Sequence, residues 1–395
     1  MSDRIEIPLR DLVEVVVDNR GKTPPISEAG HELLEVNAIS QDRRTPDYSK
    51  VRKFVSEETY RNWFRKGHPQ PGDILVPTVG TIGNVALVRE NRGAIAQNLI
   101  ALRLKENVDS GYVYYFLSSS LGKDLMLSLD IGGVQPSIKV PHLLDLEIPI
   151  TDYEEQMTVA AILSSLDDKI DLLRRQNKTL EALAETLFRQ WFVEEAQDDW
   201  KKVKITDLFE VRDGTHDSPK QTVIGRPLIT SKHILDGRLD IGNAYLISED
   251  DFNKVNQRSK VDTWDILFSM IGTIGLLYLE KSPDINYVIK NIGLFKTSQN
   301  PDWAIYTYLW LRSPIGRQFI DEHTSGSTQE YVALSSLRGI TFQELPKETL
   351  NKFNKLVSGT FSKIYLNRNQ VQTLEKLRDT LLPKLMSGEV RVSHA

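Results

Sequence analysis

The residues closest to a known chemical motif are Gly21, Lys22 and Thr23, which have the order found at the end of a phosphate-binding loop. Such a loop requires another glycine five residues before Gly21, and that position is Val16. The seven histidines are scattered, with no His-Glu-x-x-His pair and no close cluster with carboxylates. We therefore expect neither a phosphate-binding loop nor a metal site.

Motifs for other chemistries are also missing. The chain has no cysteine, which excludes thiolate nucleophiles and cysteine-ligated zinc and is compatible with a reducing cytosol. No serine elbow for acyl transfer stands out. We also find no cluster of acidic residues with a lysine, as a nuclease would need, and no Asn-Pro-Pro-aromatic or Asp-Pro-Pro-aromatic tetrapeptide, as in amino-methyltransferases. The sequence thus predicts a protein without a catalytic site.

The composition sets broad limits on the fold and on partners. The 395 residues are enough for two or three domains with their own cores. No run of 18 apolar residues occurs, so no membrane span is predicted, and the charged first ten residues do not have the pattern of a signal peptide. A formal net charge of −5 argues against a generic nucleic-acid coat, but it allows a DNA binder whose basic residues lie on one face.

A long helix is predicted from Glu154 to Trp191, because no proline interrupts this segment and apolar residues recur in steps of four and three. These 38 residues would form a helix of roughly 57 Å. Asn177 is a polar residue on this seam. The seam consists of Leu166, Ile170, Leu173, Asn177, Leu180, Ala184, Leu187 and Trp191.

A second copy of this helix lies 194 residues further on, since Lys169-Ile170 corresponds to Lys363-Ile364 (363 − 169 = 194). We expect this helix to end at Pro383 and Gly388. Its seam consists of Thr360, Ile364, Asn367, Val371, Leu374, Arg378, Leu381 and Leu385, extended at the N-terminal side by Phe353 and Val357.

The segments before the two helices match as well. Gly72-Asp73-Ile74-Leu75 corresponds to Trp264-Asp265-Ile266-Leu267, and Gly80-Thr81-Ile82-Gly83 to Gly272-Thr273-Ile274-Gly275, both with an offset of 192 (264 − 72 = 192). In both halves the second of these segments is expected to be a tight turn. The sequence therefore predicts an internal duplication.

We predict an α+β protein with two similar mixed α/β domains, residues 1–152 and 196–346, separated by two long antiparallel coiled-coil helices, residues 153–195 and 347–395, in a pseudo-twofold repeat. Within the first domain, residues 94–104 are expected to form one strand and residues 112–129 one helix. In the second domain, residues 288–297 are expected to form one strand.

In this order, and duplicated, the motifs resemble those of the specificity (S) subunit of type I restriction-modification systems. The resemblance covers almost the whole chain. The second half departs from the pattern of the first half at two places. It has Trp264 where the first half has Gly72, and Glu330-Tyr331 where the first half has Pro136-Ser137. The segments that carry the resemblance, besides the paired segments above, are Asp213–Pro219, Pro227–Lys232, Leu187–Phe192 and Leu377–Leu385.

The resemblance implies a non-catalytic protein in which each domain, a target recognition domain, reads one half of a split site in double-stranded DNA. The helices would set the spacing of the half-sites and dock two methyltransferase (modification) subunits, and restriction/translocase subunits would complete the complex. S-adenosylmethionine, ATP and Mg are expected on those partner subunits, and no cofactor in this chain. A cytoplasmic location and no membrane partner are expected.

Residues that contact DNA are expected in loops that offer hydrogen bonds or positive charge. The alternative to DNA contact is a purely structural role. In that case Thr215 and Ser218 would satisfy a turn, Gln135 and Gln329 would bond to the backbone of their own loops, and Arg43 and Arg44 would be solvated surface residues. In the first domain the candidates are Lys22, Thr23, Asn37, Arg43, Arg44, Thr78, Thr81 and Gln135. In the second domain they are Thr215, His216, Ser218, Lys220, Ser231, Lys232, His233, Thr273 and Gln329.

Two other functions compete with this interpretation. One is a protein–protein scaffold of two helix-linked domains with no nucleic-acid role. The other is a single-chain methyltransferase or nuclease, which the missing motifs disfavour. If the chain is a DNA reader, its net negative charge predicts modest DNA affinity for the isolated subunit.

Overall fold

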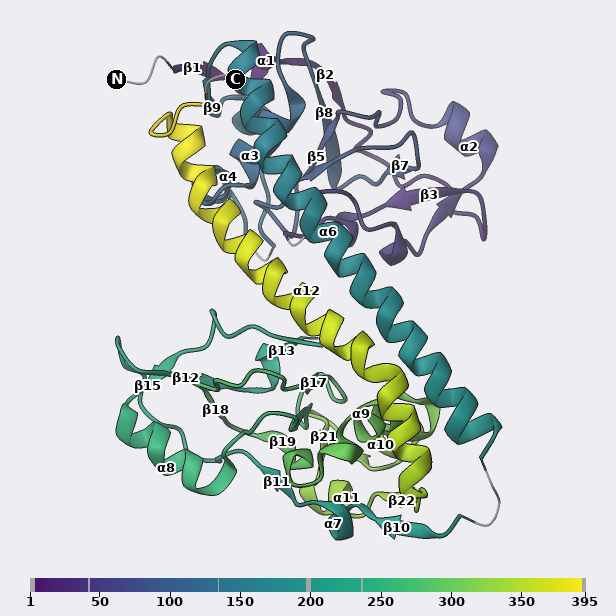
Figure 1. Ribbon diagram of the computed structural model, residues 1–395. Coiled ribbons are helices and arrows are strands. Elements are labelled where there is room, and N and C mark those ends of the chain that lie inside the picture. The colour runs from purple at the N-terminus through teal and green to yellow at the C-terminus, as the bar shows by residue number, and fades with distance from the viewer. Residues whose placement is uncertain (1–3, 42, 134, 197–199, 236, 393–395) are drawn as a thin grey trace. The chain divides into compact units, whose positions relative to one another are not determined.

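The computed structural model describes residues 4–41, 43–133, 135–196, 200–235 and 237–392 (Figure 1). The chain divides into two compact units. Unit 1 comprises residues 1–172 and 371–395, and unit 2 comprises residues 173–370. Each unit thus includes part of each long helix, whereas the sequence assigned the helices to segments of their own.

The centre of unit 1 is a four-stranded antiparallel sheet in the order β2–β8–β5–β6. Its strands are nearly all apolar because both faces of the sheet are covered. Ile74 and Ile100 pack into a core that includes helix α3, whereas the alternate residues Leu75 and Ala101 pack into a core on the other face. The strands are β2 (Val13–Val17), β5 (Ile74–Pro77), β6 (Ala86–Leu87) and β8 (Leu99–Leu104), and α3 is Ser110–Ser118.

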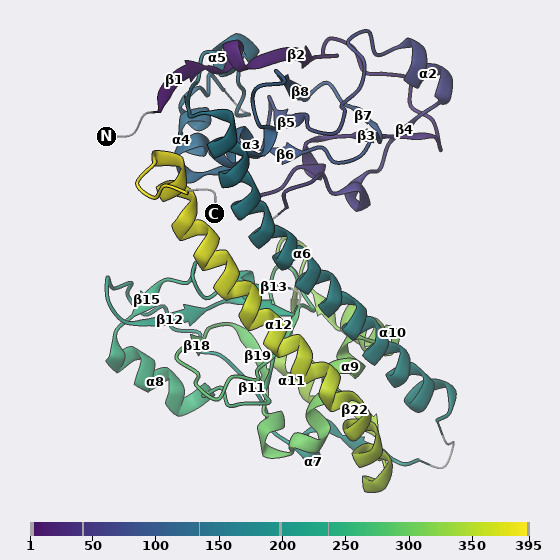
Figure 2. The ribbon, with the colours of Figure 1, turned by 45° about the horizontal axis from the view of Figure 1, so that its top comes forward.

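A smaller sheet of unit 1 lies beside helix α2 and has the order β4–β3–β7 (Figure 2). Strand β3 is antiparallel to β4 and parallel to β7. The strands β1 and β9 pair separately, antiparallel. The bounds are β1 (Ile5–Pro8), β3 (His31–Leu34), β4 (Phe54–Val55), β7 (Ala94–Ile95), β9 (Glu147–Ile150), α1 (Leu9–Leu12), α2 (Glu57–Asn62), α4 (Ser120–Ser128), α5 (Val140–Leu144) and the 3₁₀ turns η1 (Val36–Ala38) and η2 (Tyr48–Lys50).

Unit 2 repeats this topology strand by strand. Its main sheet has the order β11–β19–β16–β17 and its smaller sheet β15–β12–β18, with β12 parallel to β18, and β10 pairs with β22. The strands are β10 (Lys202–Lys204), β11 (Val211–Asp213), β12 (Arg226–Ile229), β15 (Leu246–Ile247), β16 (Ile266–Ser269), β17 (Leu277–Leu279), β18 (Val288–Ile289), β19 (Ile292–Phe295) and β22 (Thr341–Gln343).

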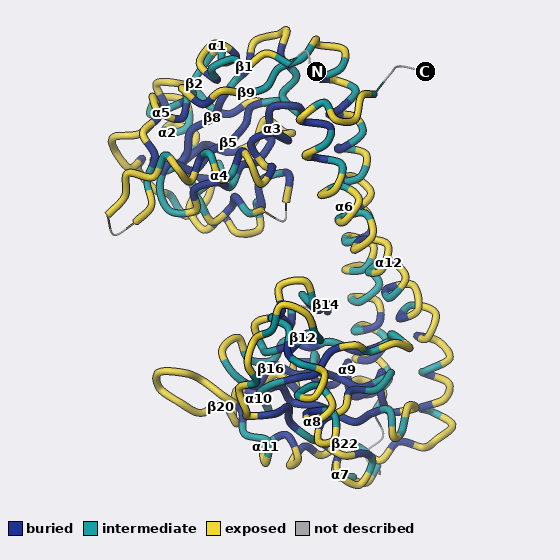
Figure 3. Tube along the Cα trace, turned by 90° about the vertical axis from the view of Figure 1, so that its left-hand side faces the viewer, coloured by how far each residue is buried: buried dark blue, intermediate teal, exposed yellow. Residues whose placement is uncertain are grey.

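Unit 2 also has two small hairpins, β13–β14 and β20–β21. The second hairpin ends in an exposed loop (Figure 3). The strands are β13 (Ile234–Leu235), β14 (Arg238–Leu239), β20 (Thr324–Ser325) and β21 (Tyr331–Val332). The helices and 3₁₀ turns of unit 2 are α7 (Ile205–Leu208), η4 (Ser231–His233), α8 (Glu249–Ser259), η5 (Thr297–Gln299), η6 (Pro301–Trp303), α9 (Ala304–Arg312), α10 (Pro314–Glu322) and α11 (Leu334–Arg338).

The two long helices are α6 (Tyr153–Arg189), which continues into a π-helical turn at Gln190–Glu194, and α12 (Lys347–Ser387). The prediction of an α+β fold with two similar units and two long helices is confirmed. The prediction that Pro383 ends the second helix is wrong, since α12 passes through Pro383 and stops at Gly388 with a φ of 73°. A proline near a helix end removes one hydrogen bond, which the packing of Leu382 and Leu385 offsets.

Three predicted elements are each split in two. Residues 94–104 form β7 and β8 in different sheets, residues 288–297 contain β18 and β19, and residues 112–129 form α3 and α4. The helix breaks at Ser119, whose hydroxyl accepts the N–H of Gly122 at 3.1 Å and so caps α4. The strand breaks place polar residues at one edge of each unit.

Candidate nucleic-acid interface

In unit 2 the loops after the strands converge at one edge. Because β12 and β18 are parallel, their carboxyl ends meet there, and Ser231 Oγ donates a hydrogen bond to the Asn291 carbonyl oxygen at 3.2 Å. The ring Nδ1 of His216 lies 2.8 Å from Asn291 Oδ1. Lys290 Nζ donates to Ser218 Oγ. We call these residues, with Thr215, the polar edge of unit 2.

Asn291 is central to this edge because of its backbone. Its φ of 52° lies in the left-handed region, which asparagine tolerates better than most residues. This conformation ends β18 and starts β19 one residue later. The Asn291 N–H then donates to the carbonyl oxygen of Thr215 at 3.2 Å, which joins the turn to the loop after β11.

The ring of His216 is held from both sides. Its Nε2 lies 2.8 Å from Asp213 Oδ2, and the other carboxylate oxygen of Asp213 accepts from Arg258 at 2.7 Å. The side chain of His216 is nevertheless largely exposed. It is therefore positioned by the fold while remaining open to solvent, as a residue that contacts a ligand must be.

The structure places other unit 2 candidates differently. Thr215 is buried, and its Oγ1 accepts the N–H of Asp217 at 3.1 Å. Thr215 therefore satisfies a turn, as in the structural alternative to DNA contact. His233 is 2% exposed, and its Nδ1 accepts the N–H of Thr230 at 2.9 Å. Burial lowers the pKa of His233, so its ring is a neutral helix cap rather than a surface group. Lys220 and Lys232 are exposed.

The corresponding edge of unit 1 surrounds a hollow of about 130 Å³. It is lined by Thr23, Glu35, Lys53, Gln97 and Asn98, among others, and Lys53 Nζ donates to Glu35 Oε1 at 2.7 Å. We call this group the polar edge of unit 1.

Residues near this edge have mixed roles. The hydroxyl of Thr78 is buried and donates to the Asn98 carbonyl oxygen at 3.3 Å, so it supports the turn from within. Lys22 is exposed. Asn37 is exposed and donates to the Lys50 carbonyl oxygen at 3.2 Å, and Arg43 pairs with Asp47 at 3.2 Å.

Arg44 lies away from solvent, with 8% exposure. Its guanidinium pairs with Asp168 of α6 and donates to Tyr115 at 3.4 Å. In place of the DNA contact suggested by the sequence, this geometry favours a role in fixing α6 to unit 1.

In each unit the Gly-Thr-Ile-Gly turn lies next to a second loop, which carries Gln135 in unit 1 and Gln329 in unit 2. The N–H of Gly80 donates to the Pro136 carbonyl oxygen at 2.9 Å, and the N–H of Gly272 donates to that of Glu330 at 3.4 Å. All four glycines of the two Gly-Thr-Ile-Gly turns have positive φ, between 79° and 88°, which explains why glycine is needed there. The structure thus brings together predicted residues that are all exposed, namely Thr81 with Gln135 and Thr273 with Gln329.

Sequence reasoning missed Lys290 and Asn291 in unit 2 and Gln97 and Asn98 in unit 1. It treated the segments that contain them as continuous strands. The sequence signal that could have revealed them is a pair of adjacent polar residues, the second an asparagine, inside an otherwise apolar segment. An asparagine at such a place can turn the chain.

The repeated Asp-Ile-Leu motif has a structural role. Asp73 is 1% exposed and accepts from Arg103 at 3.0 and 2.9 Å. Asp265 is fully buried and pairs with Lys296, which corresponds to Arg103. Trp264 has a φ of 78° where Gly72 has 95°, so the departure from the first half keeps the turn.

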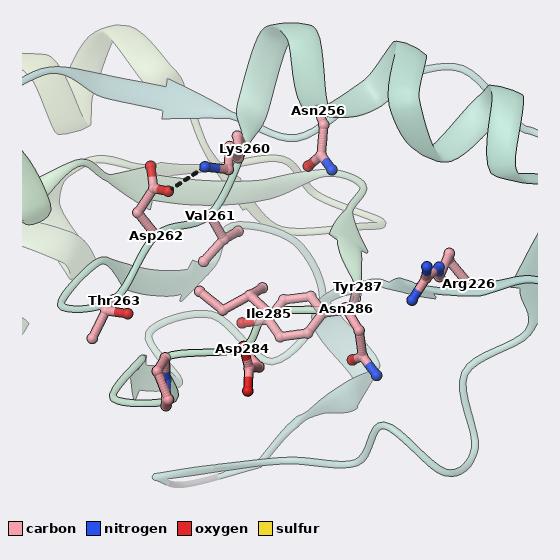
Figure 4. A pocket seen from close by; sticks show the side chains of 11 residues that line it. Arg226, Asn256, Lys260, Val261, Asp262, Thr263, Asp284, Ile285, Asn286 and Tyr287 are labelled. Atoms are coloured by element: carbon pink, nitrogen blue, oxygen red, sulfur yellow. Dashed lines mark ion pairs between the residues drawn. The ribbon is translucent and has the colours of Figure 1, made fainter.

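A hollow of about 440 Å³ lies at the other end of the smaller sheet of unit 2 (Figure 4). Its lining includes Arg226 at the start of β12 and Tyr287 just before β18, opposite the polar edge. Lys260 pairs with Asp262 there at 2.8 Å. Charges of both signs line this hollow, and none of the predicted residues does. In the described part of the chain, no group of three or more His, Asp or Glu residues is arranged to hold a metal ion.

Within each unit, α6 and α12 contact each other through residues of the helix seams. In unit 1, Arg378 of α12 pairs with Asp167 of α6 at 2.8 Å. In unit 2, Asn367 Nδ2 donates to Asn177 Oδ1 at 2.9 Å, and Asn177 Nδ2 donates to the Ile364 carbonyl oxygen at 3.3 Å. Of the predicted seam residues, the buried ones are Ile170, Leu173, Ala184, Phe353, Val357, Ile364, Asn367, Val371 and Leu385, and the half-buried ones are Leu166, Asn177, Leu180, Leu187, Trp191, Thr360, Leu374, Arg378 and Leu381.

Comparison with known proteins shows what this chain is similar to. Residues 6–182 match the family model of the type I restriction modification DNA specificity domain. The chain is therefore similar to type I specificity proteins. It resembles the type I restriction enzyme MjaIX specificity subunit of Methanocaldococcus jannaschii, with 26% identity over 87% of this chain and 83% of the relative. It is also similar to the HindI specificity subunit of Haemophilus influenzae, with 23% identity over 67% and 73%.

A similar fold is known from a crystal structure. The type I restriction-modification S subunit from M. genitalium aligns over 100% of this chain and 97% of its own, with a TM-score of 0.55 and 18% sequence identity. At this identity the match supports the fold alone. Separately, none of the described helices is long and apolar enough to span a membrane.

Proposed function

We propose that this chain is the sequence-specific DNA-recognition subunit of a type I restriction-modification complex, with each unit reading one half of a bipartite site. The observation that carries the proposal is the duplicated scaffold with different polar edges. The same strand order presents Thr23 and Gln97 in unit 1 but His216 and Lys290 in unit 2. Two readers on one scaffold require this combination, because base edges are distinguished by side-chain donors and acceptors.

We further propose that α6 and α12 set the gap between the half-sites and dock two methyltransferase subunits, with restriction subunits joining the complex. In this proposal S-adenosylmethionine, ATP and Mg are bound by the partners, and the complex acts in the cytoplasm. The similarity to named specificity subunits supports this function over a protein scaffold without a nucleic-acid role.

The test is methylome sequencing of cells that express this chain with the methyltransferase encoded beside it. We expect a split motif with methylated adenine in both halves that disappears when the chain is deleted. A stable complex that produces no new methylation would contradict the proposal and favour the scaffold function.

A further inference from the structure

Two units that read different half-sites need different side chains where they read bases. They need the same side chains only where they contact something that both half-sites share. The polar edges differ, as described above. The question is therefore which exposed side chains keep the same chemistry at equivalent positions of the two units.

Three pairs keep the same chemistry at equivalent positions, and two of them are exposed in both units. The first two are Thr81 with Thr273 and Gln135 with Gln329, which are identical and exposed in both units. The third is a cation, Lys123 of α4 in unit 1 and Arg317 of α10 in unit 2. We call Thr81, Lys123 and Gln135 the shared patch of unit 1, and Thr273, Arg317 and Gln329 the shared patch of unit 2.

The backbone shows that the threonine and glutamine positions are equivalent. The turn of Thr81 bonds to the loop of Gln135 through Gly80 and Pro136, and the turn of Thr273 bonds to the loop of Gln329 through Gly272 and Glu330. Antiparallel bridges between Val79 and Ser137 and between Ile271 and Tyr331 repeat the same connection. The neighbouring Pro136 and Glu330 differ, so these loops are not simply unchanged copies.

The cations are equivalent for a separate reason. Lys123 and Arg317 each follow a serine cap and a glycine that is packed against the preceding helix, at Ser119-x-x-Gly122 and Ser313-x-x-Gly316. In unit 1 the cation is close to the turn, since a Cβ added at Gly83 would lie 2.8 Å from Lys123 Cγ. The side chain of Lys123 therefore lies against the turn that carries Thr81, whereas no atom of the described residues lies within 4 Å of the corresponding point at Gly275 in unit 2.

We propose that the shared patches bind the sugar-phosphate backbone of DNA and position each unit on its half-site, independently of sequence. A hydroxyl, a carboxamide and a cation suit phosphate oxygens. The backbone is the part of DNA that every half-site has in common. This inference rests on the proposed DNA recognition and adds to it a division of labour, in which the shared patches position each unit and the polar edges discriminate bases.

The test uses the full chain assembled with its methyltransferase subunits. Fluorescence anisotropy measures the affinity for a random-sequence duplex and for a duplex with the site found by methylome sequencing, over a series of NaCl concentrations. We expect Lys123→Ala and Arg317→Ala to weaken binding to both duplexes by the same factor. Each should reduce the slope of log K against log salt by about 0.9, the value for one lost phosphate contact.

Gln135→Ala and Gln329→Ala should weaken binding to both duplexes equally. The slope of log K against log salt should change little, because glutamine is neutral. The matched control is Lys105→Ala, since Lys105 is exposed at the opposite end of β8 from the turn of Thr81 and should leave the slope unchanged. A change in the ratio of the two affinities, an unchanged slope in both cation variants, or lost subunit assembly with unchanged DNA binding would overturn the inference. Failure of the proposed function would be seen separately, as a wild-type complex that does not distinguish the two duplexes.

Discussion

Asn291 links two loops that are far apart in the sequence. Its side chain faces His216, its carbonyl oxygen accepts from Ser231, and its N–H donates to Thr215. One residue thus fixes the geometry of the polar edge of unit 2. A carboxamide at such a position is also suited to read a base, because it can donate and accept at once.

We therefore expect Asn291→Ala to relax base discrimination in one half-site by about tenfold and to leave the other half-site unchanged. Methylation of site libraries in which each base is varied measures this directly. The control is Asn256→Ala, because Asn256 lies at the opposite end of the same sheet. Equal relaxation in both half-sites, or none, would contradict a reading role.

His233 predicts a pH dependence of unit 2. Burial lowers the pKa of its imidazole, and the charge of Lys232 acts in the same direction. The unfolded chain then binds a proton more readily than the folded chain, so the free energy of unfolding should be constant above about pH 6.5 and fall as the pH drops below it. His233→Asn keeps an acceptor for the Thr230 N–H and cannot titrate, so it should flatten this dependence.

Hydrogen exchange of unit 2 amides across this pH range is the measurement for His233. The substitution His323→Asn, at an exposed position, serves as the control. A decline below pH 6.5 that is equally steep in wild type and His233→Asn would show that other groups govern acid stability.

At this scale the sequence identified exposed loop residues such as His216 and Gln329 but not which of its candidates are buried. Arg44 and His233 are of residue types that suit DNA, and only their tertiary partners reveal their structural roles. Asn291 was missed for the converse reason. A φ of 52° at one asparagine interrupts a pattern that otherwise favours a continuous strand.

Among the elements, the long helices are the ones that the sequence predicted best, because a repeat of 3.5 residues over many turns has few alternative explanations. The shorter elements were harder. Strands of two to four residues carry too little pattern to mark their ends, and a serine cap inside an apolar segment separates α3 from α4.

The Asn177–Asn367 pair gives the helix seam of unit 2 a polar layer. Asn367 is fully buried, and within the described residues its Oδ1 has no hydrogen-bond partner. Such a layer lowers stability and favours one register, because any shift would separate the two carboxamides. The register of α6 against α12 in unit 2 is thus specified by residues as well as by apolar packing.

A double-mutant cycle tests this assignment. Asn367→Leu alone should lower the free energy of unfolding of unit 2 by about 1–3 kcal/mol, because it leaves Asn177 Oδ1 without the donor that Asn367 supplies. Asn177→Leu with Asn367→Leu should recover the loss. Denaturant unfolding followed by hydrogen exchange gives both values, with the exposed Lys363→Leu as control. Additive losses in the double variant would argue against a coupled pair.

For the molecule as a whole, the duplication gives each unit the same framework and α6 and α12 contribute to both. The boundary between the units falls after Leu172 in α6 and after Gln370 in α12. These two positions allow the helices to be lengthened without changing any contact within a unit.

We expect that inserting seven residues at each of these positions will widen the gap between methylated half-sites while both half-site sequences stay the same. Seven residues keep the seam in phase and add about 10.5 Å, or about three base pairs. Methylome sequencing reads the gap. Inserting two residues at each position, which breaks the seam, is the control and should abolish methylation. An unchanged gap after the seven-residue insertions would rule out a spacing role for the helices.

The division of the chain also has a consequence for its synthesis. Unit 2 is one continuous segment, whereas the apolar core of unit 1 includes Leu382, Leu385 and Met386, which are made after all of unit 2. A ribosome makes residues 1–172 before most of unit 2, but their core is completed only after unit 2 has been made.

Unit 2 should therefore fold before unit 1, the reverse of the usual order in which domains fold as they emerge. A chain that stops at Gln370 should resist limited proteolysis in residues 173–370 and be cleaved readily before them. Equal resistance of both segments would refute this order. Until residues 371–392 are translated, only unit 2 is complete, so we expect a chain terminated before them to be a single-unit product.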